Sequence, residues 1–400
     1  MQILQTIISY LVIAAGFISS LFPSGDLKMV PYTNNYKIPD SIPEYQVIST
    51  EEKTDWKAKW IWDKENLTEN NVWMCLNKKV KLNKIPEKLT AHISADSKYW
   101  LYINGETVVF EGSVKRGPAK NSGYYDSIDI APFLKKGENS ICALVWFWDN
   151  ETSYSYSSSG QGGFLFEAIS EDITIISDKS WKAKRNDAYV DSPLYPPNYR
   201  LPEYSIYFDA GEDMSNWINE GYDVSSWETA TEYDVGGEGA YGKLYPRGIP
   251  FLKDYGLKDY ENSKEYENYT VSKLFGEKIT VDIPYNAQLT PYLKIIAPAG
   301  KKIRITTENT LIGAVSTTYI TKEGEQEFEA LGWFNGEHIT YKIPKGVTVV
   351  SLKYRETGYD SSFCGDFKCD DEFLNSLWQK SLRTLYVTMR DNFMDCPDRE

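Results

Sequence analysis

The last six residues bring together side chains that could carry acid–base chemistry. Asp395 and Glu400 supply two carboxyl groups, and Arg399 lies beside the second. A carboxylic acid can donate or accept a proton at a reacting group, and a guanidinium can hold an oxygen in a charge-assisted hydrogen bond. The spacing alone equally fits solvated loop acids, so the surrounding sequence has to decide between the two interpretations.

An amphipathic helix is expected before this segment, over residues 371–390. Asp370 and Asp371 are good N-cap residues, and apolar residues then recur at helical spacing. These are Phe373, Leu374, Leu377, Trp378, Leu382, Leu385 and Met389. Because one helix cannot form a domain by itself, we expect residues 366–400 to be the start of a truncated helical domain and the sequence to be a fragment.

Short strands and turns fill most of the preceding sequence. Residues 99–103 are followed by Asn104-Gly105, a strong β-hairpin signal. Strands at this spacing predict a β-sandwich or jelly roll. We expect one such region over residues 56–250 and a second over residues 251–365. The predicted fold class is therefore mainly β, with tandem jelly-roll-like sandwiches followed by one helix.

Composition narrows the partners. The chain has 400 residues, enough for two or three domains, and a net charge of −14. The electrostatic field of this negative charge repels polyanions, so no nucleic-acid partner is expected. Aromatic residues make up 14% of the chain. They fit either strands, which favour aromatic residues, or sugar binding by flat aromatic faces, and composition does not choose between these.

The N-terminus resembles an export signal. Residues 3–22 carry no charge, the apolar run spans 7–18, and Pro23-Ser24-Gly25 ends it. We expect residues 1–25 to be a signal peptide, although the run could also remain as an uncleaved anchor. Residues 26–55 are interpreted as a linker. The expected location is secreted or periplasmic, with no membrane contact beyond this segment.

Cofactor signals are weak. The five cysteines are scattered and the two histidines, His92 and His338, are far apart, so no zinc site is expected. A bridge between Cys364 and Cys369 is conceivable, but buried free thiols are favoured. No cofactor is expected. The acid-rich stretch at 209–213 could bind a structural Ca²⁺, although a surface turn explains it as well.

The C-terminal segment carries a family resemblance. Residues 384–400, which end in the motif Asp-Cys-Pro-Asp-Arg-Glu at 395–400, resemble the entry to the six-hairpin (α/α)₆ barrel of glycoside hydrolase family 78, the α-L-rhamnosidases. Upstream segments resemble the same enzymes more weakly. These are Trp60-Ile61-Trp62, the stretch from Ser94 to Gly105, Tyr124-Tyr125-Asp126, residues 207–212, residues 221–227 and residues 364–370.

The resemblance implies a function and roles for the motif residues. Family 78 enzymes release terminal α-L-rhamnose with inversion, using one carboxylic acid to protonate the leaving oxygen and a second carboxylate to activate water. Glu400 aligns with the general acid, and Asp395 with a carboxylate that binds the rhamnose hydroxyls. Arg399 is expected to hold a carboxylate or a sugar oxygen. The implied partner is a rhamnose-containing oligo- or polysaccharide.

The family's general base lies downstream of residue 400, so the 400 residues alone are expected to be inactive.

Two functions other than catalysis stay open. The β-sandwiches could instead form a non-catalytic carbohydrate-binding module, or could only brace the barrel. The reading frame beyond Glu400 would separate the enzyme from these alternatives.

Overall fold

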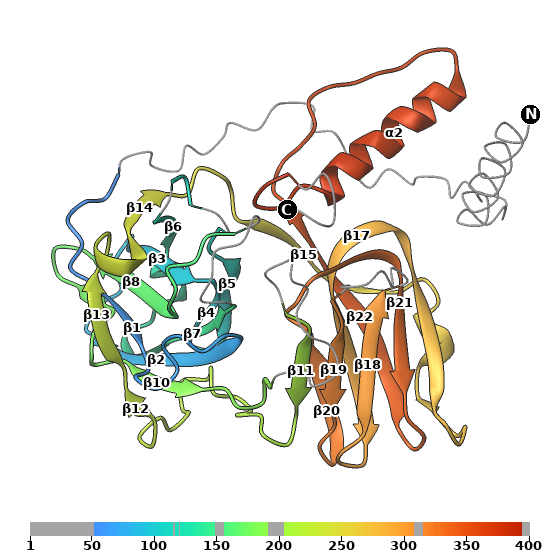
Figure 1. Ribbon diagram of the computed structural model, residues 1–400, viewed down its shortest axis with the longest axis horizontal. Coiled ribbons are helices and arrows are strands. Elements are labelled where there is room, and N and C mark those ends of the chain that lie inside the picture. The colour runs from blue at the N-terminus through green and yellow to red at the C-terminus, as the bar shows by residue number, and fades with distance from the viewer. Residues whose placement is uncertain are drawn as a thin grey trace, which may run out of the picture. The chain divides into compact units, whose positions relative to one another are not determined.

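The computed structural model describes residues 52–114, 117–119, 121–148, 156–190, 204–307 and 315–393. The expected signal peptide and nearly all of the expected linker lie outside the described residues, as do Asp395, Arg399 and Glu400. Within the described residues the chain is mainly β, as predicted, and contains the single α-helix α2 (Figure 1). No helix among them is long and apolar enough to cross a membrane.

Two sheets form the first β-domain. The seven-stranded sheet runs in the order β13 (Thr231–Val235), β1 (Lys59–Trp62), β8 (Gly163–Ile169), β3 (Thr90–Asp96), β6 (Ser122–Asp129) and β14 (Lys243–Pro246), with β9 (Thr174–Ile176) paired to β8. The six-stranded sheet runs in the order β12 (Glu228–Thr229), β10 (Lys182–Arg185), β2 (Val72–Leu82), β7 (Gly137–Phe147), β4 (Lys98–Ile103) and β5 (Glu106–Gly112).

Alternation along the strands makes these two sheets a sandwich. Successive side chains of a strand point to opposite faces. On β2, Val72, Met74 and Leu76 join the apolar cluster between the two sheets, whereas Trp73 and Cys75 belong to a second cluster on the outer face. The predicted hairpin is confirmed, because β4 and β5 pair across Asn104-Gly105 with both turn residues at positive φ.

A nine-stranded sheet forms the second β-domain. Its order is β11 (Ile206–Asp209), β19 (Thr317–Ile320), β18 (Lys302–Thr307), β21 (Phe334–Ile343), β17 (Glu277–Ala297), β22 (Thr348–Tyr359) and β15 (Leu252–Asp259). Two short strands complete it: β16 (Tyr269–Thr270) pairs with β22, and β20 (Gly324–Glu329) pairs with β17. The strand β11 joins this sheet although it precedes residue 250 in the sequence.

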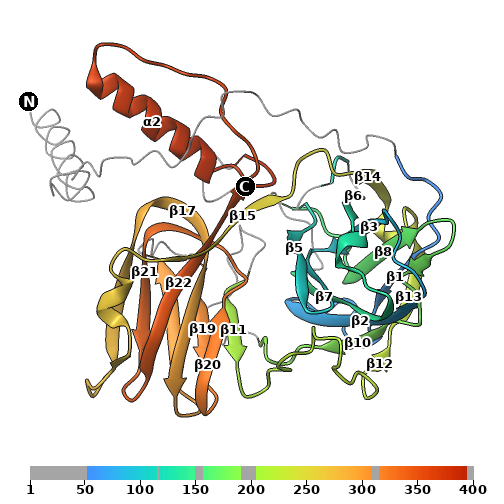
Figure 2. The ribbon, with the colours of Figure 1, turned by 180° about the vertical axis from the view of Figure 1, so that it is seen from behind.

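The long strand β17 lets this sheet curl (Figure 2). Its first part pairs with β21, its last part pairs with β20 on the same edge, and β22 pairs along the other edge. The register with β21 shifts between Asp282 and Ala287, and such bulges bend a strand. Gln288 lies just after this shift and is buried.

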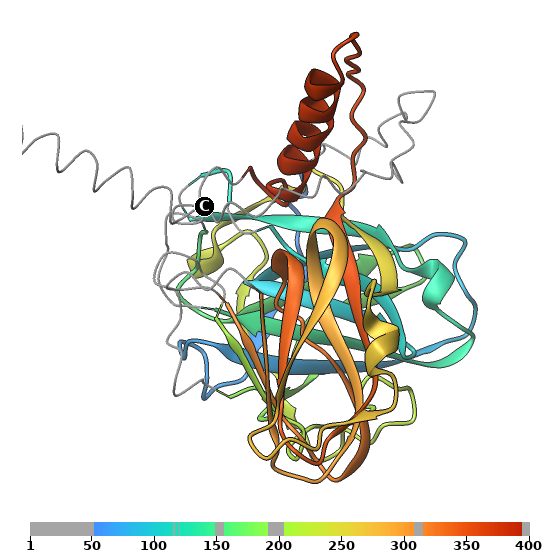
Figure 3. The same cartoon turned by 90° about the vertical axis from the view of Figure 1, so that its right-hand side faces the viewer.

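The helix α2 (Glu372–Val387) begins where the sequence predicts. The Asp371 carboxylate accepts hydrogen bonds from the backbone N–H groups of Phe373 and Leu374, at 2.8 and 3.2 Å. Its C-terminal turn contacts β17 and β22, while most of the helix stands clear of the sheets (Figure 3). Phe373, Leu374, Leu377 and Leu385 are consequently exposed.

Short 3₁₀ helices connect the strands at Ala131–Phe133, Gly239–Tyr241 and Ser263–Tyr266.

The expectation of buried free thiols is correct for two cysteines and wrong for two others. Cys75 and Cys142 are free and buried, but Cys364 is free and exposed and Cys369 is half-exposed. The segment that carries the latter pair packs loosely ahead of α2, so burial cannot be expected from the apolar character of cysteine alone.

Candidate functional site

The described chain leads up to the predicted catalytic motif and stops short of it. Asp395, Arg399 and Glu400 lie outside the described residues. The segment before them forms a tight turn: Met389 and Phe393 form an isolated β-bridge, and the Arg390 N–H donates to the Asn392 carbonyl at 3.1 Å. The structure therefore shows how the chain approaches the motif.

Gln288 of β17 holds the end of α2. Its side-chain amide Nε2 donates to the carbonyls of Val387, at 2.7 Å, and Met389, at 3.1 Å. The last carbonyls of a helix have no partner within the helix, so this buried amide satisfies acceptors that would otherwise be orphaned. Its Oε1 accepts a hydrogen bond from Arg390 Nη1 at 2.8 Å.

Arg390 connects this segment to both β-domains. Its Nε donates to Glu111 Oε1 at 3.2 Å, and its Nη2 donates to Glu111 Oε2. Nη1 also reaches Thr357 Oγ1 of β22 at 3.3 Å, and the guanidinium lies 4.6 Å from the centre of the Trp333 ring. The Arg390 side chain is only 2% exposed. Glu111 belongs to β5 of the first β-domain, so the pair crosses between the domains.

The Glu111 carboxylate has a second cationic partner. Lys98 Nζ lies 2.7 Å from its Oε1, and all three side chains are buried. Burial by itself raises the pKa of the Glu111 carboxyl, but the charges of Arg390 and Lys98 outweigh that effect and lower the pKa. The carboxylate is thus ionised at neutral pH, and buried charges are tolerated because they are paired.

A second anchor fixes the C-terminal half of α2 to the second β-domain. Arg383 Nη2 lies 3.2 Å from Glu356 Oε1 of β22, and its Nε donates to the Asn286 carbonyl at 2.7 Å. The Tyr386 and Tyr255 hydroxyls share a hydrogen bond of 2.7 Å. These contacts and the Arg390 contacts hold the C-terminal half of α2 and residues 388–390 against the β-domains.

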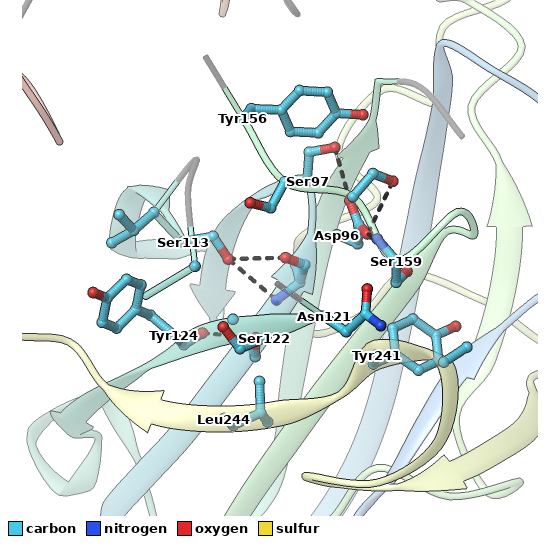
Figure 4. Close-up of a pocket in the computed structure, with 18 of the residues that line it drawn as sticks. Asp96, Ser97, Ser113, Asn121, Ser122, Tyr124, Tyr156, Ser159, Tyr241 and Leu244 are labelled. Atoms are coloured by element: carbon cyan, nitrogen blue, oxygen red, sulfur yellow. Dashed lines mark hydrogen bonds between the residues drawn. The ribbon is translucent and has the colours of Figure 1, made fainter. Parts of the chain in front are cut away.

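The first β-domain also contains a pocket of about 300 Å³ (Figure 4). Ligand pockets span roughly 300–1,000 Å³, so this one suits a small ligand. Hydroxyl, amide, carboxyl and aromatic groups from β3, β6, β14 and neighbouring loops line it. Its members include Trp60, Ser94, Asp96, Ser97, Ser113, Asn121, Ser122, Tyr124, Tyr156, Ser158, Ser159, Tyr241 and Leu244.

Asp96 is the buried carboxyl of this pocket. Its Oδ2 accepts hydrogen bonds from the Ser159 N–H, at 2.6 Å, and the Ser159 hydroxyl, at 2.8 Å. Its Oδ1 accepts one from Ser97 Oγ at 3.1 Å. Burial raises the pKa of Asp96 to about 6, although these hydrogen bonds oppose the rise. The group can therefore change its protonation state near neutral pH.

Aromatic rings build the pocket walls. Trp60 stacks on Tyr241 with ring centres 4.0 Å apart and an angle of 7°, and the Tyr241 hydroxyl donates to the Gly162 carbonyl at 2.7 Å. Tyr124 is half-exposed on the opposite side of the pocket (Figure 4). Rings beside hydroxyl and carboxyl groups fit a small neutral ligand with several hydroxyl groups.

Sequence reasoning missed most of these residues. The family-like segments contain the pocket residues Trp60, Ser94, Asp96 and Tyr124, and segment 384–400 contains Arg390, but none of these was nominated as a site residue. Glu111 and Gln288 were not singled out at all. Arg390 and Glu111 are 279 positions apart, and no local pattern links them. For the acid-rich stretch, the Asp209 carboxylate accepts from the Gly211 N–H within its own turn. The described residues contain no group of three or more potential metal ligands.

Comparison with known proteins identifies the architecture. No family model matches the chain. An α-L-rhamnosidase from Formosa agariphila is 23% identical over 366 residues, covering 80% of this chain and 35% of that protein. The GH78 family rhamnosidase of Bacillus sp. GL1 superposes with a TM-score of 0.73 at 16% identity, covering 87% of this chain and 60% of that chain. The chain has the family 78 rhamnosidase fold.

Other solved structures agree with this family 78 fold. The α-L-rhamnosidase of Dictyoglumus thermophilum gives a TM-score of 0.65 at 20% identity, covering 86% of this chain and 40% of that chain. The Streptomyces avermitilis enzyme, solved with L-rhamnose, gives 0.61 at 16% identity, covering 82% and 33%. The resemblance expected from the C-terminal motif is confirmed. The chain spans only 35% of the length of the Formosa agariphila relative.

Proposed function

We propose that this chain is part of an α-L-rhamnosidase that releases terminal α-L-rhamnose from plant or microbial glycans. The similarity to an α-L-rhamnosidase over 80% of the chain carries the proposal. The exposed apolar residues of α2 support it, because Phe373, Leu374 and Leu377 offer a face on which the further helices of a barrel can pack.

The proposed reaction inverts the anomeric centre. Glu400 acts as the general acid that protonates the leaving oxygen, while Asp395 and Arg399 bind the sugar. A second carboxylate, from residues beyond Glu400, acts as the general base. Inverting glycosidases hold their two carboxyl groups roughly 6.5–9.5 Å apart to leave room for the attacking water. Without that general base the attacking water is not activated, so the 400 residues alone should be inactive.

The test compares two proteins on p-nitrophenyl α-L-rhamnoside. The full-length protein should release nitrophenol and L-rhamnose. NMR should show that the released sugar first has the inverted anomeric configuration. Residues 26–400 should not. Clear turnover by residues 26–400 would show that the catalytic groups are misassigned. No turnover by a folded full-length protein on several rhamnosides would reject the rhamnosidase proposal.

The apolar run at 7–18 supports a further proposal, that the enzyme is exported to the periplasm or the medium. Expression in a bacterial host with and without residues 1–25 tests it. The full chain should be recovered outside the cytoplasm, and the shortened chain inside. Recovery of both in the cytoplasm would contradict export.

The pocket favours a second candidate function, binding of one sugar residue by the first β-domain. Its aromatic walls and its hydroxyl and carboxyl groups support this role. Titration of residues 26–400 with L-rhamnose and methyl α-L-rhamnoside, followed by NMR or calorimetry, should show saturable binding. Tyr124→Ala should weaken it, and Tyr245→Ala, on the neighbouring strand outside the pocket, should not. No binding at millimolar sugar would reject this function.

A further inference from the structure

Both β-domains contact the segment between α2 and the predicted catalytic motif. Gln288 and Thr357 of the second β-domain and Glu111 of the first β-domain all contact Val387–Arg390 through buried polar groups. Arg390 is the one side chain of this segment that these hydrogen bonds join to both β-domains. It lies five residues before Asp395 and ten before Glu400.

Arg390 is already fully engaged. Nε and Nη2 are bound to Glu111, Nη1 is shared by Gln288 and Thr357, and the Trp333 ring covers the guanidinium. A guanidinium used in this way has little capacity left for substrate. Its two parallel bonds to a carboxylate fix orientation as well as distance, which a lysine ammonium cannot do.

We propose that Glu111 and Arg390 are positioning residues that fix the chain at Arg390, just ahead of the predicted catalytic residues at 395–400, to the first β-domain. The inference rests on the proposed rhamnosidase function. Through this pair the first β-domain takes part in catalysis, because it supplies the carboxylate that holds Arg390 in place. Displacement of a catalytic group by about 1 Å can cost roughly 10²-fold in rate.

The two cations on Glu111 provide a matched pair of variants. Arg390→Lys keeps the charge but loses the bidentate bond and the contacts to Gln288 and Thr357. Lys98→Met removes the other cation from the same carboxylate and leaves the Glu111–Arg390 pair in place. Glu111→Asp keeps all charges, withdraws the carboxylate by one methylene, and tolerates the positive φ of 63° at this position.

The test is the rate of the full-length enzyme on two kinds of substrate. Arg390→Lys and Glu111→Asp should lower kcat about 10–100-fold on rhamnosyl sugars, and less on p-nitrophenyl α-L-rhamnoside, because a displaced general acid matters most for a poor leaving group. Lys98→Met should stay within about threefold on both. A loss of folded protein alone would lower both rates equally.

Hydrogen exchange of residues 387–393 gives a readout that does not need activity. Exchange should be faster in Arg390→Lys and Glu111→Asp than in the wild type or Lys98→Met. Unchanged exchange, or rates of both variants within twofold of the wild type, would overturn the positioning role. If the wild type hydrolyses no rhamnoside, the proposed function fails, and the exchange measurement alone decides whether the Glu111–Arg390 pair holds the segment.

Discussion

Arg383 of α2 and Glu356 of β22 form a buried ion pair, with Nη2 and Oε1 3.2 Å apart. Glu356 also accepts from Lys258 Nζ at 2.6 Å and from the Tyr285 hydroxyl at 2.9 Å. The Arg383 guanidinium lies 4.2 Å from the centre of the Tyr285 ring. The helix is thus fastened to the curled sheet by a charge network at its C-terminal half, while its N-terminal half is exposed.

Removing Arg383 should release α2 from the sheet. Arg383→Met leaves a buried carboxylate with one cation fewer, and breaking a buried ion pair costs about 3–5 kcal/mol. Urea denaturation of residues 26–400 should show a loss of unfolding free energy at the lower end of this range, because Lys258 still pairs with Glu356. Lys380→Met changes an exposed cation on the same helix and is the control. Equal stability of the two variants would contradict the anchoring role.

Asp371 should matter for α2 and its neighbour Asp370 should not. The Asp371 carboxylate accepts from two N–H groups of the first turn, and loss of such an N-cap costs about 0.5–2 kcal/mol. Asp371→Ala should therefore increase hydrogen exchange over residues 372–379, whereas Asp370→Ala should leave it unchanged. The same exchange in both variants would assign the capping role elsewhere.

Asp96 should make folding stability depend on pH. Its pKa is about 6 in the folded chain against 3.8 for an ordinary aspartate. Between these values the folded state holds a proton that the unfolded chain has released. The free energy of unfolding should therefore fall by at most about 3 kcal/mol as the pH rises from about 4 to 6. Above pH 6 it should stay at this lower level.

The Asp96 prediction is tested by urea denaturation at pH 4 and pH 7. Asp96→Asn stays neutral, so its stability relative to the wild type should improve on going from pH 4 to pH 7. Asp366→Asn, an exposed carboxyl ahead of α2, should follow the wild type. A constant difference between Asp96→Asn and the wild type at both pH values would show that Asp96 does not titrate in this range.

The parts of the fold that are encoded locally could be predicted. Asn104-Gly105 forms its turn because both residues tolerate positive φ, and Asp371 caps α2 because its carboxylate reaches N–H groups two and three residues ahead. Neither feature depends on a distant partner. The mainly β character also follows from local alternation.

Non-local contacts could not be predicted from one sequence. The parallel pairing of β11 with β19 joins residues about 110 positions apart, and the partners of Arg390 come from strands on two domains. Burial of Glu111 and Asp96 likewise depends on which surfaces meet. The predicted roles of Asp395, Arg399 and Glu400 stay predictions, because those residues lie outside the described chain.

The leaving-group dependence of Glu400→Gln in the full-length enzyme tests the central claim most directly. General acid catalysis contributes about 10²–10⁴-fold, and a sugar leaving group needs the proton far more than nitrophenolate does. Glu400→Gln should depress hydrolysis of rhamnosyl sugars strongly and hydrolysis of p-nitrophenyl α-L-rhamnoside much less. Asp395→Asn should lower both rates alike, because it weakens sugar binding in the transition state. Equal losses on the two substrates for Glu400→Gln would contradict the general acid role.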